Sequence, residues 1–220
     1  PWFADNEGGP VVDMGPYYIT ALVTLLGPVK SVTSKAKKVF LEREIGIGPR
    51  KGKKFKVECD TTYVSTLEFK NNSLIQMTLS FDVKDHKRNH IELYGEKGSI
   101  IVPDPNMFGG SAFTCLELGG EWTEHETHIL ELGKINIKNQ SSRANESPTN
   151  ANYRGAGLSE MAYSIENKSK HMCNGELSLH VLDIIQSIMR SANTQKTELL
   201  STECIIPELF TQDRIKKILK

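Results

Sequence analysis

The chain has 220 residues, of which 38% are hydrophobic and 25% charged, with 27 Lys and Arg against 27 Asp and Glu. A net charge of zero argues against a nucleic-acid partner, because that binding depends on neutralising phosphates, and the longest apolar run, residues 19–26, is far short of the ~20 residues that cross a membrane. Four cysteines without paired spacing indicate reduced thiols in a cytoplasmic protein rather than zinc ligands or disulfides.

The first predicted element is a helix that begins near Asp13 and ends before Gly27. We expect Asp13 to be its N-cap and Pro16 to lie in its first turn, since proline lacks the amide hydrogen. Asp13 and Tyr17 are four residues apart, so they share a helix face and can address the same small volume. They are candidate catalytic residues, although an Asp and a Tyr at a helix start more often serve capping and packing.

Segments of alternating apolar and polar residues then predict β-strands. They are expected over residues 29–41, 55–69, 73–83, 90–94, 98–102, 113–118 and 121–130. A tight turn at Asn71-Asn72 joins the second strand to the third, because asparagine tolerates left-handed backbone angles. Successive hairpins favour a mostly antiparallel sheet with one buried face and one face that is partly polar or used for association. The basic run at residues 50–54 is interpreted as a solvated strand edge.

Candidate substrate-binding residues follow the strands. Asp104 and Asn106 lie in a loop that two prolines make rigid, and such loops often carry ligand contacts, although a plain strand-ending turn is an alternative. Residues 139–152 are rich in Asn, Ser and Thr and predict a mobile loop. Arg154, just before a glycine turn, has a planar donor fork that suits a substrate hydroxyl or carboxylate, or simply anchors the loop.

Two helices are predicted near the C-terminus. Apolar residues at helical spacing mark the first at Leu158, Met161, Ala162 and Ile165, and the second at Leu177, Val181, Leu182, Ile185, Ile188 and Met189. His180 lies at the border of the second apolar stripe, where both a packing role and a substrate contact remain open. The remaining histidines lack a third ligand at suitable spacing, so no metal site is predicted. We predict an α+β fold with one large, mostly antiparallel sheet, helices packed on one face, and a single domain over residues 1–220.

Three blocks of the sequence resemble one known family. They are GGPVVDMGPYYITALVTLLGPV, HIELYGEKGSIIVPDPNMFGG, and YRGAGLSEMAYSI with the following GELSLHVLDIIQSIMRSA. In this order they resemble the C-terminal, substrate-side domain of the Gfo/Idh/MocA oxidoreductases, whose fold is like the C-terminal domain of glyceraldehyde-3-phosphate dehydrogenase. Many family members have His at the position of Tyr17, and branches with tyrosine use it as the acid/base. The resemblance therefore implies Tyr17 as acid/base, Asp13 as a positioning residue, and His180 near the substrate cleft.

The resemblance also implies a reaction: hydride transfer between NAD or NADP and an alcohol carbon of a sugar, polyol or related small molecule. The family binds its cofactor mainly through an N-terminal nucleotide-binding domain, and no matching fingerprint is found, since the glycines at residues 46–52 have the wrong spacing and are interpreted as a loop. The family's lysine from that domain is missing as well. We therefore expect the substrate-side half of a longer enzyme, inactive alone and homo-oligomeric through the open face of its sheet. A non-catalytic sugar-binding or dimerisation domain, and a lyase or glycosidase that uses NAD transiently, remain alternatives.

Overall fold

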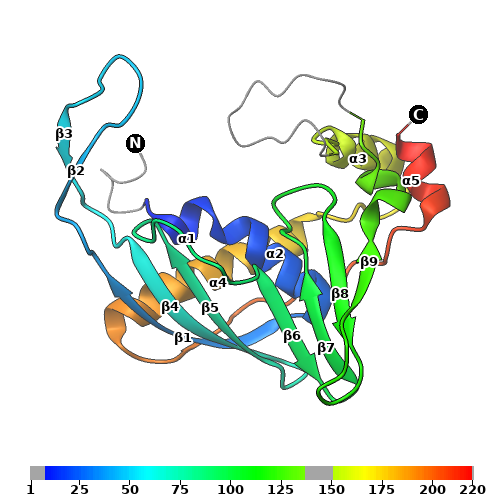
Figure 1. The fold of residues 1–220 in the computed structure, drawn as a ribbon, viewed down its shortest axis with the longest axis horizontal. Helices are drawn as coiled ribbons and strands as arrows, with labels where there is room; N and C mark the ends of the chain where they lie inside the picture. The colour runs from blue at the N-terminus through cyan, green and yellow to red at the C-terminus, as the bar shows by residue number, and fades with distance from the viewer. Residues whose placement is uncertain (1–7, 137–150, 220) are drawn as a thin grey trace. The chain divides into compact units, whose positions relative to one another are not determined.

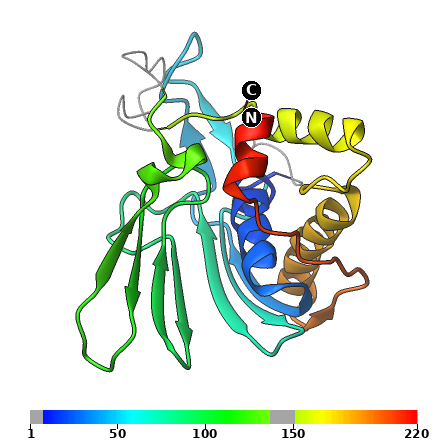
Figure 2. The same ribbon diagram turned by 90° about the vertical axis from the view of Figure 1, so that its right-hand side faces the viewer.

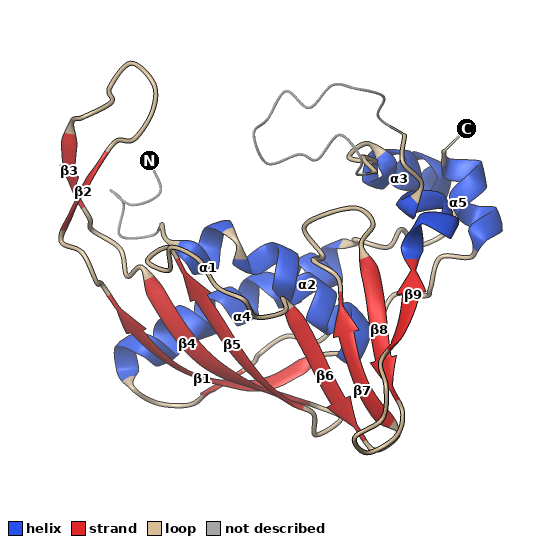
Figure 3. Cartoon of the chain, in the orientation of Figure 1, coloured by secondary structure: helices blue, strands red, loops and turns tan. Residues whose placement is uncertain are grey.

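The computed structural model describes residues 8–136 and 151–219 (Figure 1). Residue contacts divide the chain into two compact units, unit 1 with Pro1–His86 and Cys173–Pro207, and unit 2 with Lys87–Met172 and Glu208–Lys220. Both contain helices together with runs of consecutive antiparallel strands (Figure 3), so the predicted α+β class is confirmed. The strands form two four-stranded sheets and one two-stranded ribbon, not the one large sheet that was predicted. That residues 1–220 make one domain stays a prediction.

The sheet of unit 1 has the strand order β10-β1-β4-β5. Its strands are β1 (Val29–Lys37), β4 (Thr62–Phe69), β5 (Leu74–Ser80) and the short β10 (Glu198–Leu199). The turn between β4 and β5 contains Asn72 with φ 68°, the left-handed conformation expected there. Tyr63, Ser65, Leu67 and Phe69 are buried while Val64 and Thr66 are exposed, which confirms the predicted alternation.

Three helices cover one face of this sheet, as Figure 2 shows: α1 (Pro10–Asp13), α2 (Gly15–Leu26) and α4 (Gly175–Thr194). The core between helices and sheet consists of fully buried apolar side chains, namely Ile19, Val23, Val29, Val32, Leu67, Phe69, Ile184 and Ile188. Asn174 caps α4 by accepting a hydrogen bond from the Leu177 amide at 3.0 Å. This packing gives the start of α2 a rigid support.

The ribbon of unit 1 pairs β2 (Glu42–Glu44) with β3 (Lys54–Lys56). The long strand predicted over residues 55–69 is therefore wrong, because the chain leaves β3 at residue 57 and enters β4 only at Thr62. The basic run is exposed throughout, as predicted, but it reaches a strand edge only at Lys54 of β3, and residues 50–53 lie in the loop. The glycine-rich residues 46–52 form a loop, as predicted.

Unit 2 contains the sheet β6-β7-β8-β9, in which every neighbouring pair is antiparallel. The strands are β6 (Ile91–Gly95), β7 (Gly98–Val102), β8 (Ser111–Cys115) and β9 (Thr123–Glu126), followed by two short 3-10 helices, η1 (Thr127–Ile129) and η2 (Glu131–Gly133). Its helices are α3 (Ala156–Glu166) and α5 (Gln212–Ile218), the latter not predicted. The predicted hairpins β6–β7 and β8–β9 are confirmed.

The apolar stripe expected to bury α3 lies on its exposed side. Leu158 and Ile165 are 74% and 71% exposed, whereas Glu160 and Ser164 are buried. Most of the loop predicted at 139–152 lies outside the described residues. Within the described chain, none of the helices combines the length and apolarity needed to cross a membrane. All four cysteines are free thiols.

Candidate functional site

The first helix begins earlier than the sequence predicted. Pro10 opens α1 directly after Gly9, a position where proline is favoured because the first helical amide needs no partner. Gly9 has φ 105°, and a Cβ there would lie 2.8 Å from the Asp60 carbonyl oxygen, so only glycine fits this close approach to the chain before β4. Asp13 is consequently the last residue of α1, and its predicted role as N-cap is wrong.

Pro16 explains why the helix is interrupted. It lies in the first turn of α2, as predicted, where its missing amide costs no intrahelical bond. Met14 separates the two helices in a right-handed helical conformation, with φ −102° and ψ −26°. The chain therefore continues in nearly helical geometry from Asp13 to Tyr17, and the pair stays on consecutive turns.

Both predicted catalytic side chains reach solvent. Tyr17 is 48% exposed and Asp13 is partly exposed, so neither is sealed in the core. Among residues 8–136 and 151–219, no hydrogen bond or ion pair to either side chain is found. Ile19 and Leu22, further along α2, are buried and fix the helix against the rest of unit 1. A phenol and a carboxylate on a rigid helix start are thus available to a ligand.

His180 occupies a different environment. It has no exposed surface, and its Nε2 accepts a hydrogen bond from the Val29 amide at 3.0 Å. Its Nδ1 lies 2.9 Å from Thr202 Oγ1, and the Thr202 hydroxyl donates to Asp183 Oδ2. Nδ1 therefore carries the proton and donates to Thr202. Both ring nitrogens are engaged in the core, so we assign His180 a structural role in place of the predicted substrate contact.

The ionisation of this cluster agrees with that role. Burial lowers the pKa of His180, against the opposing attraction of Asp183. Asp183 is desolvated, yet the hydrogen bonds from Thr202 and Ser201 hold the pKa of its carboxyl below the ordinary value. No sequence pattern indicated this network, because Ser201 and Thr202 lie outside every predicted element.

Asp104 and Asn106 lie in the loop after β7, in unit 2. The Asp104 side chain accepts a hydrogen bond from the Asn106 backbone amide at 3.0 Å. The Asp104 carbonyl oxygen accepts one from the Met107 amide at 3.1 Å. Its Oδ2 lies 3.6 Å from His90 Nε2. The carboxylate thus stabilises a turn, the alternative that the sequence left open.

Arg154 is exposed just before α3, and its backbone amide donates to Asn152 Oδ1 at 3.3 Å. It belongs to unit 2, as do Asp104 and Asn106, whereas Asp13 and Tyr17 belong to unit 1. Of the predicted site residues, Asp13 and Tyr17 are therefore the pair that unit 1 brings together on consecutive helical turns. No cluster of three or more His, Cys, Asp or Glu side chains within the described parts could hold a metal ion.

Comparison with family models tests the predicted resemblance. Residues 1–101 match the model of the GFO/IDH/MocA C-terminal domain. The predicted resemblance to this family is confirmed. The matched region includes the Asp13–Tyr17 pair, the sheet of unit 1 except β10, and the first strand hairpin of unit 2 up to Ile101. A search of curated protein sequences finds no significant match.

Solved structures share the fold. Levoglucosan dehydrogenase superposes with a TM-score of 0.67 at 16% identity over 93% of this chain and 55% of its own. An oxidoreductase from Agrobacterium radiobacter in complex with NAD+, L-tartaric acid and magnesium has a TM-score of 0.64 at 14% identity, over 90% of this chain and 51% of its own. Aldose-aldose oxidoreductase from Caulobacter crescentus, complexed with glycerol, has a TM-score of 0.60 at 18% identity, over 91% of this chain and 51% of its own. The chain spans about half the length of these proteins.

Proposed function

We propose that this chain is the substrate-side domain of an NAD(P)-dependent oxidoreductase, which moves a hydride between the nicotinamide and an alcohol carbon of a sugar, polyol or related small molecule. The observation that carries the proposal is the solvent-accessible pair Asp13, at the end of α1, and Tyr17, in the first turn of α2. Within the described residues neither side chain has a hydrogen-bond or ion-pair partner, and both lie in the family-matched region. The complexes of similar structures with NAD+, tartaric acid and glycerol support the cofactor and substrate class.

Tyr17 acts as the general acid/base. Its phenol oxygen accepts the proton of the substrate hydroxyl during oxidation and returns it during reduction, a role that requires a solvent-accessible group within hydrogen-bonding reach of the ligand. Asp13 accepts a hydrogen bond from a neighbouring substrate hydroxyl and so orients the reacting carbon. Its negative charge opposes formation of a phenolate nearby, and for that reason Asp13 is a positioning residue and not the base.

The cofactor belongs to the other half of such an enzyme. The glycine-rich loop at residues 46–52 runs into strand β3 and not into a helix, so it cannot present helix amides to a pyrophosphate. This loop therefore lacks the geometry of a dinucleotide site, and we expect the 220-residue chain alone neither to turn over substrate nor to bind NAD or NADP in a calorimetric titration. When bound, the nicotinamide supplies the hydride acceptor or donor.

The test is Tyr17→Phe in the enzyme that contains this chain together with its nucleotide-binding half. We expect kcat to fall by about 100-fold or more, since general acid–base groups contribute that much. Tyr18→Phe is the matched control, because the neighbouring phenol faces another side of the helix, and it should change kcat by less than about threefold. Asp13→Asn should raise KM more than it lowers kcat, because it loses ground-state positioning.

A Tyr17→Phe enzyme that keeps more than about a third of its turnover would contradict the acid/base role. Formation of a product without net change of redox state would instead favour a lyase or glycosidase. Binding of sugar without reaction by the complete enzyme would favour the non-catalytic alternative.

Self-association through the open face of the unit 1 sheet is part of the same proposal. Two cross-strand rows of exposed residues line that face, namely Thr33, Thr66 and Gln76, and Lys35, Val64 and Thr78. A sheet with one solvated face can pair with a second copy there.

Four free thiols support a reducing, cytoplasmic location.

A further inference from the structure

The ribbon of unit 1 is a projecting, ordered element that the proposed function does not use. We call residues 42–56 the arm. Figure 1 shows that it extends away from the rest of unit 1. Two backbone hydrogen bonds close its loop: the Ile45 amide donates to the Lys53 carbonyl oxygen at 3.0 Å, and the Gly52 amide donates to the Ile45 carbonyl oxygen at 2.9 Å. The arm is therefore a defined surface and not a loose connection.

A polar cluster fixes the base of the arm. Arg43 forms an ion pair with Asp82 and donates to the Phe81 carbonyl oxygen at 3.0 Å. Asp82 also accepts hydrogen bonds from the hydroxyls of Thr61 and Thr62, both at 2.7 Å. These contacts hold β2 against the start of β4 and the end of β5, so the position of the arm within unit 1 is set by buried or part-buried groups.

The far part of the arm carries positive charge that the described residues of unit 1 do not neutralise. The arm contains six basic residues, Arg43, Arg50, Lys51, Lys53, Lys54 and Lys56, against Glu42 and Glu44. Lys54 pairs with Glu42 at 3.1 Å and Lys56 with Glu58 at 3.7 Å. Arg50, Lys51 and Lys53 are exposed, and within the described residues no ion pair to them is found. Ile47, in the same loop, is 85% exposed.

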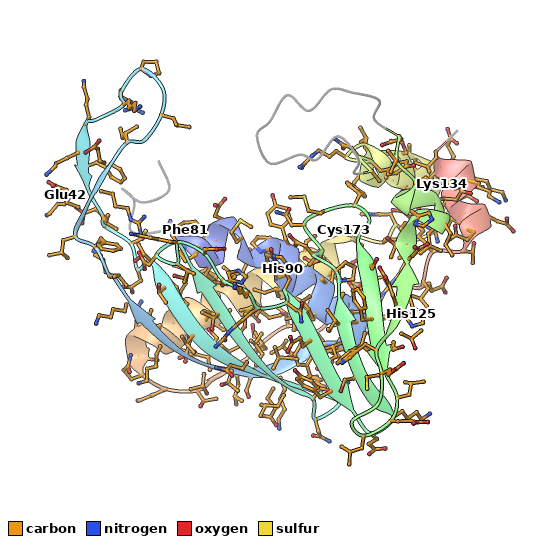
Figure 4. All side chains as sticks on the ribbon, in the orientation of Figure 1. Glu42, Phe81, His90, His125, Lys134 and Cys173 are labelled. Carbon is orange, nitrogen blue, oxygen red and sulfur yellow. The ribbon has the colours of Figure 1, made fainter. Side chains whose placement is uncertain are left out.

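A complementary surface occurs in unit 2. We call residues 117–126 the acidic strip, which comprises the turn after β8 and the edge strand β9 (Figure 4 labels His125 on this strand). It carries Glu117, Glu121, Glu124 and Glu126, all exposed. Residues 98–133 contain six carboxylates and no lysine or arginine, and the basic contact to the strip from within this segment is His128 Nε2, 3.4 Å from Glu126 Oε2. Leu118 and Trp122 of the strip are 107% and 47% exposed, and offer apolar contact beside the charges.

From this complementarity we propose that the arm docks on the acidic strip of a second copy of the chain. Arg50, Lys51 and Lys53 of one copy meet Glu121, Glu124 and Glu126 of the other, and Ile47 packs beside Trp122. Each copy carries both surfaces, so every copy can donate an arm to one contact and a strip to another. Opposed charges of this kind steer association and fix register. The contact is separate from the open face of the sheet, where none of these side chains lies.

The test measures association of the 220-residue chain by sedimentation velocity at about 50 mM and about 500 mM salt. We expect a concentration-dependent assembly that weakens at the higher salt. Reversal of the arm, Arg50→Glu with Lys51→Glu and Lys53→Glu, should weaken that assembly by at least ~10-fold. Reversal of the strip, Glu121→Lys with Glu124→Lys and Glu126→Lys, should do the same.

Mixing the two reversed variants is the decisive experiment. The negative arm of the first then meets the positive strip of the second, and the positive arm of the second meets the negative strip of the first, so assembly should return although each variant alone repels itself. Lys84→Glu with Lys87→Glu and Arg88→Glu is the control of equal charge change and should leave the wild-type assembly intact.

A wild-type chain without salt-sensitive self-association would overturn the proposal. So would a mixture of the reversed variants that assembles no better than either alone. A third outcome would also overturn it: the chain does not self-associate but binds anionic vesicles or RNA, and the arm-reversed variant loses that binding. The partner of the arm would then be a membrane or a nucleic acid and not a second copy.

Discussion

Helices α4 and α3 carry similar apolar patterns but bury opposite kinds of side chain. In α4 the apolar stripe faces the sheet, and Ile184 and Ile188 are fully buried. In α3 the stripe that includes Leu158 and Ile165 is exposed, and the buried side is polar. The comparison shows that periodicity predicts a helix and an apolar face, whereas the face that packs inside the chain depends on what the neighbouring elements offer.

The buried side of α3 is organised by a carboxylate. Glu160 Oε1 accepts hydrogen bonds from Arg214 at 2.6 Å and from the Ser164 hydroxyl at 2.9 Å, and its Oε2 accepts the Met172 amide at 3.1 Å. The Arg214 guanidinium also lies 5.6 Å from the Phe210 ring centroid. An ion pair between Glu160 and Arg214 thus joins α3 to α5.

The largest effect is expected from breaking that ion pair. Glu160→Ala leaves the Arg214 guanidinium without its partner at a part-buried site and should lower the free energy of unfolding by about 3–5 kcal/mol, measured by urea denaturation. Glu166→Ala, an exposed carboxylate on the same helix, should change it by less than about 0.5 kcal/mol. Equal effects of the two substitutions would mean that the network does not stabilise unit 2.

The same substitution in the two helices sharpens the comparison directly. Ile188→Ala removes a fully buried side chain from the core of unit 1 and should cost about 2–5 kcal/mol. Ile165→Ala removes a side chain that is 71% exposed and should cost about 0.5 kcal/mol or less. Chemical denaturation of both variants measures the difference, and a cost above about 2 kcal/mol for Ile165→Ala would show that its stripe is buried in solution.

A smaller, pH-dependent effect is expected at His180. An unfolded histidine takes up a proton near pH ~6.5, whereas burial lowers the pKa of His180 in the folded state. The unfolded state therefore binds more protons below about pH 6.5, and stability falls by up to ~1.4 kcal/mol per pH unit as pH decreases from there. His180→Gln should lose this dependence. Parallel stability curves for both proteins between about pH 7.5 and 5 would contradict the assignment.

Local signals made much of the fold predictable. The hairpin between β4 and β5 was readable because alternation and the Asn71-Asn72 turn lie within one short segment. The pairing of β10 with β1, which places Val32 opposite Glu198, could not be predicted. It joins residues far apart in sequence, and β10 has only two residues. The separate ribbon was missed for a related reason: residues 57–61 leave the strand without any glycine or proline to mark the exit.

The candidate site divides in the same way. The spacing of Asp13 and Tyr17 is a local property, and the nearly helical chain between them keeps it. The start of the helix was misplaced because Pro10 follows a glycine whose conformation depends on its contact with Asp60, in another segment. The role of His180 depends on Val29 and Thr202, which come from opposite ends of unit 1's sequence, and no pattern around position 180 reveals them.

Unit 1 is assembled from two stretches of sequence, Pro1–His86 and Cys173–Pro207, with most of unit 2 encoded between them. During biosynthesis the apolar face of β1 emerges with Val32, yet Ile188 of α4, the helix that packs on β1, follows 156 residues later. At translation rates of roughly 5–20 residues per second, α4 is completed about 8–31 s after that strand. The core of unit 1 can therefore close only after most of unit 2 has been synthesised.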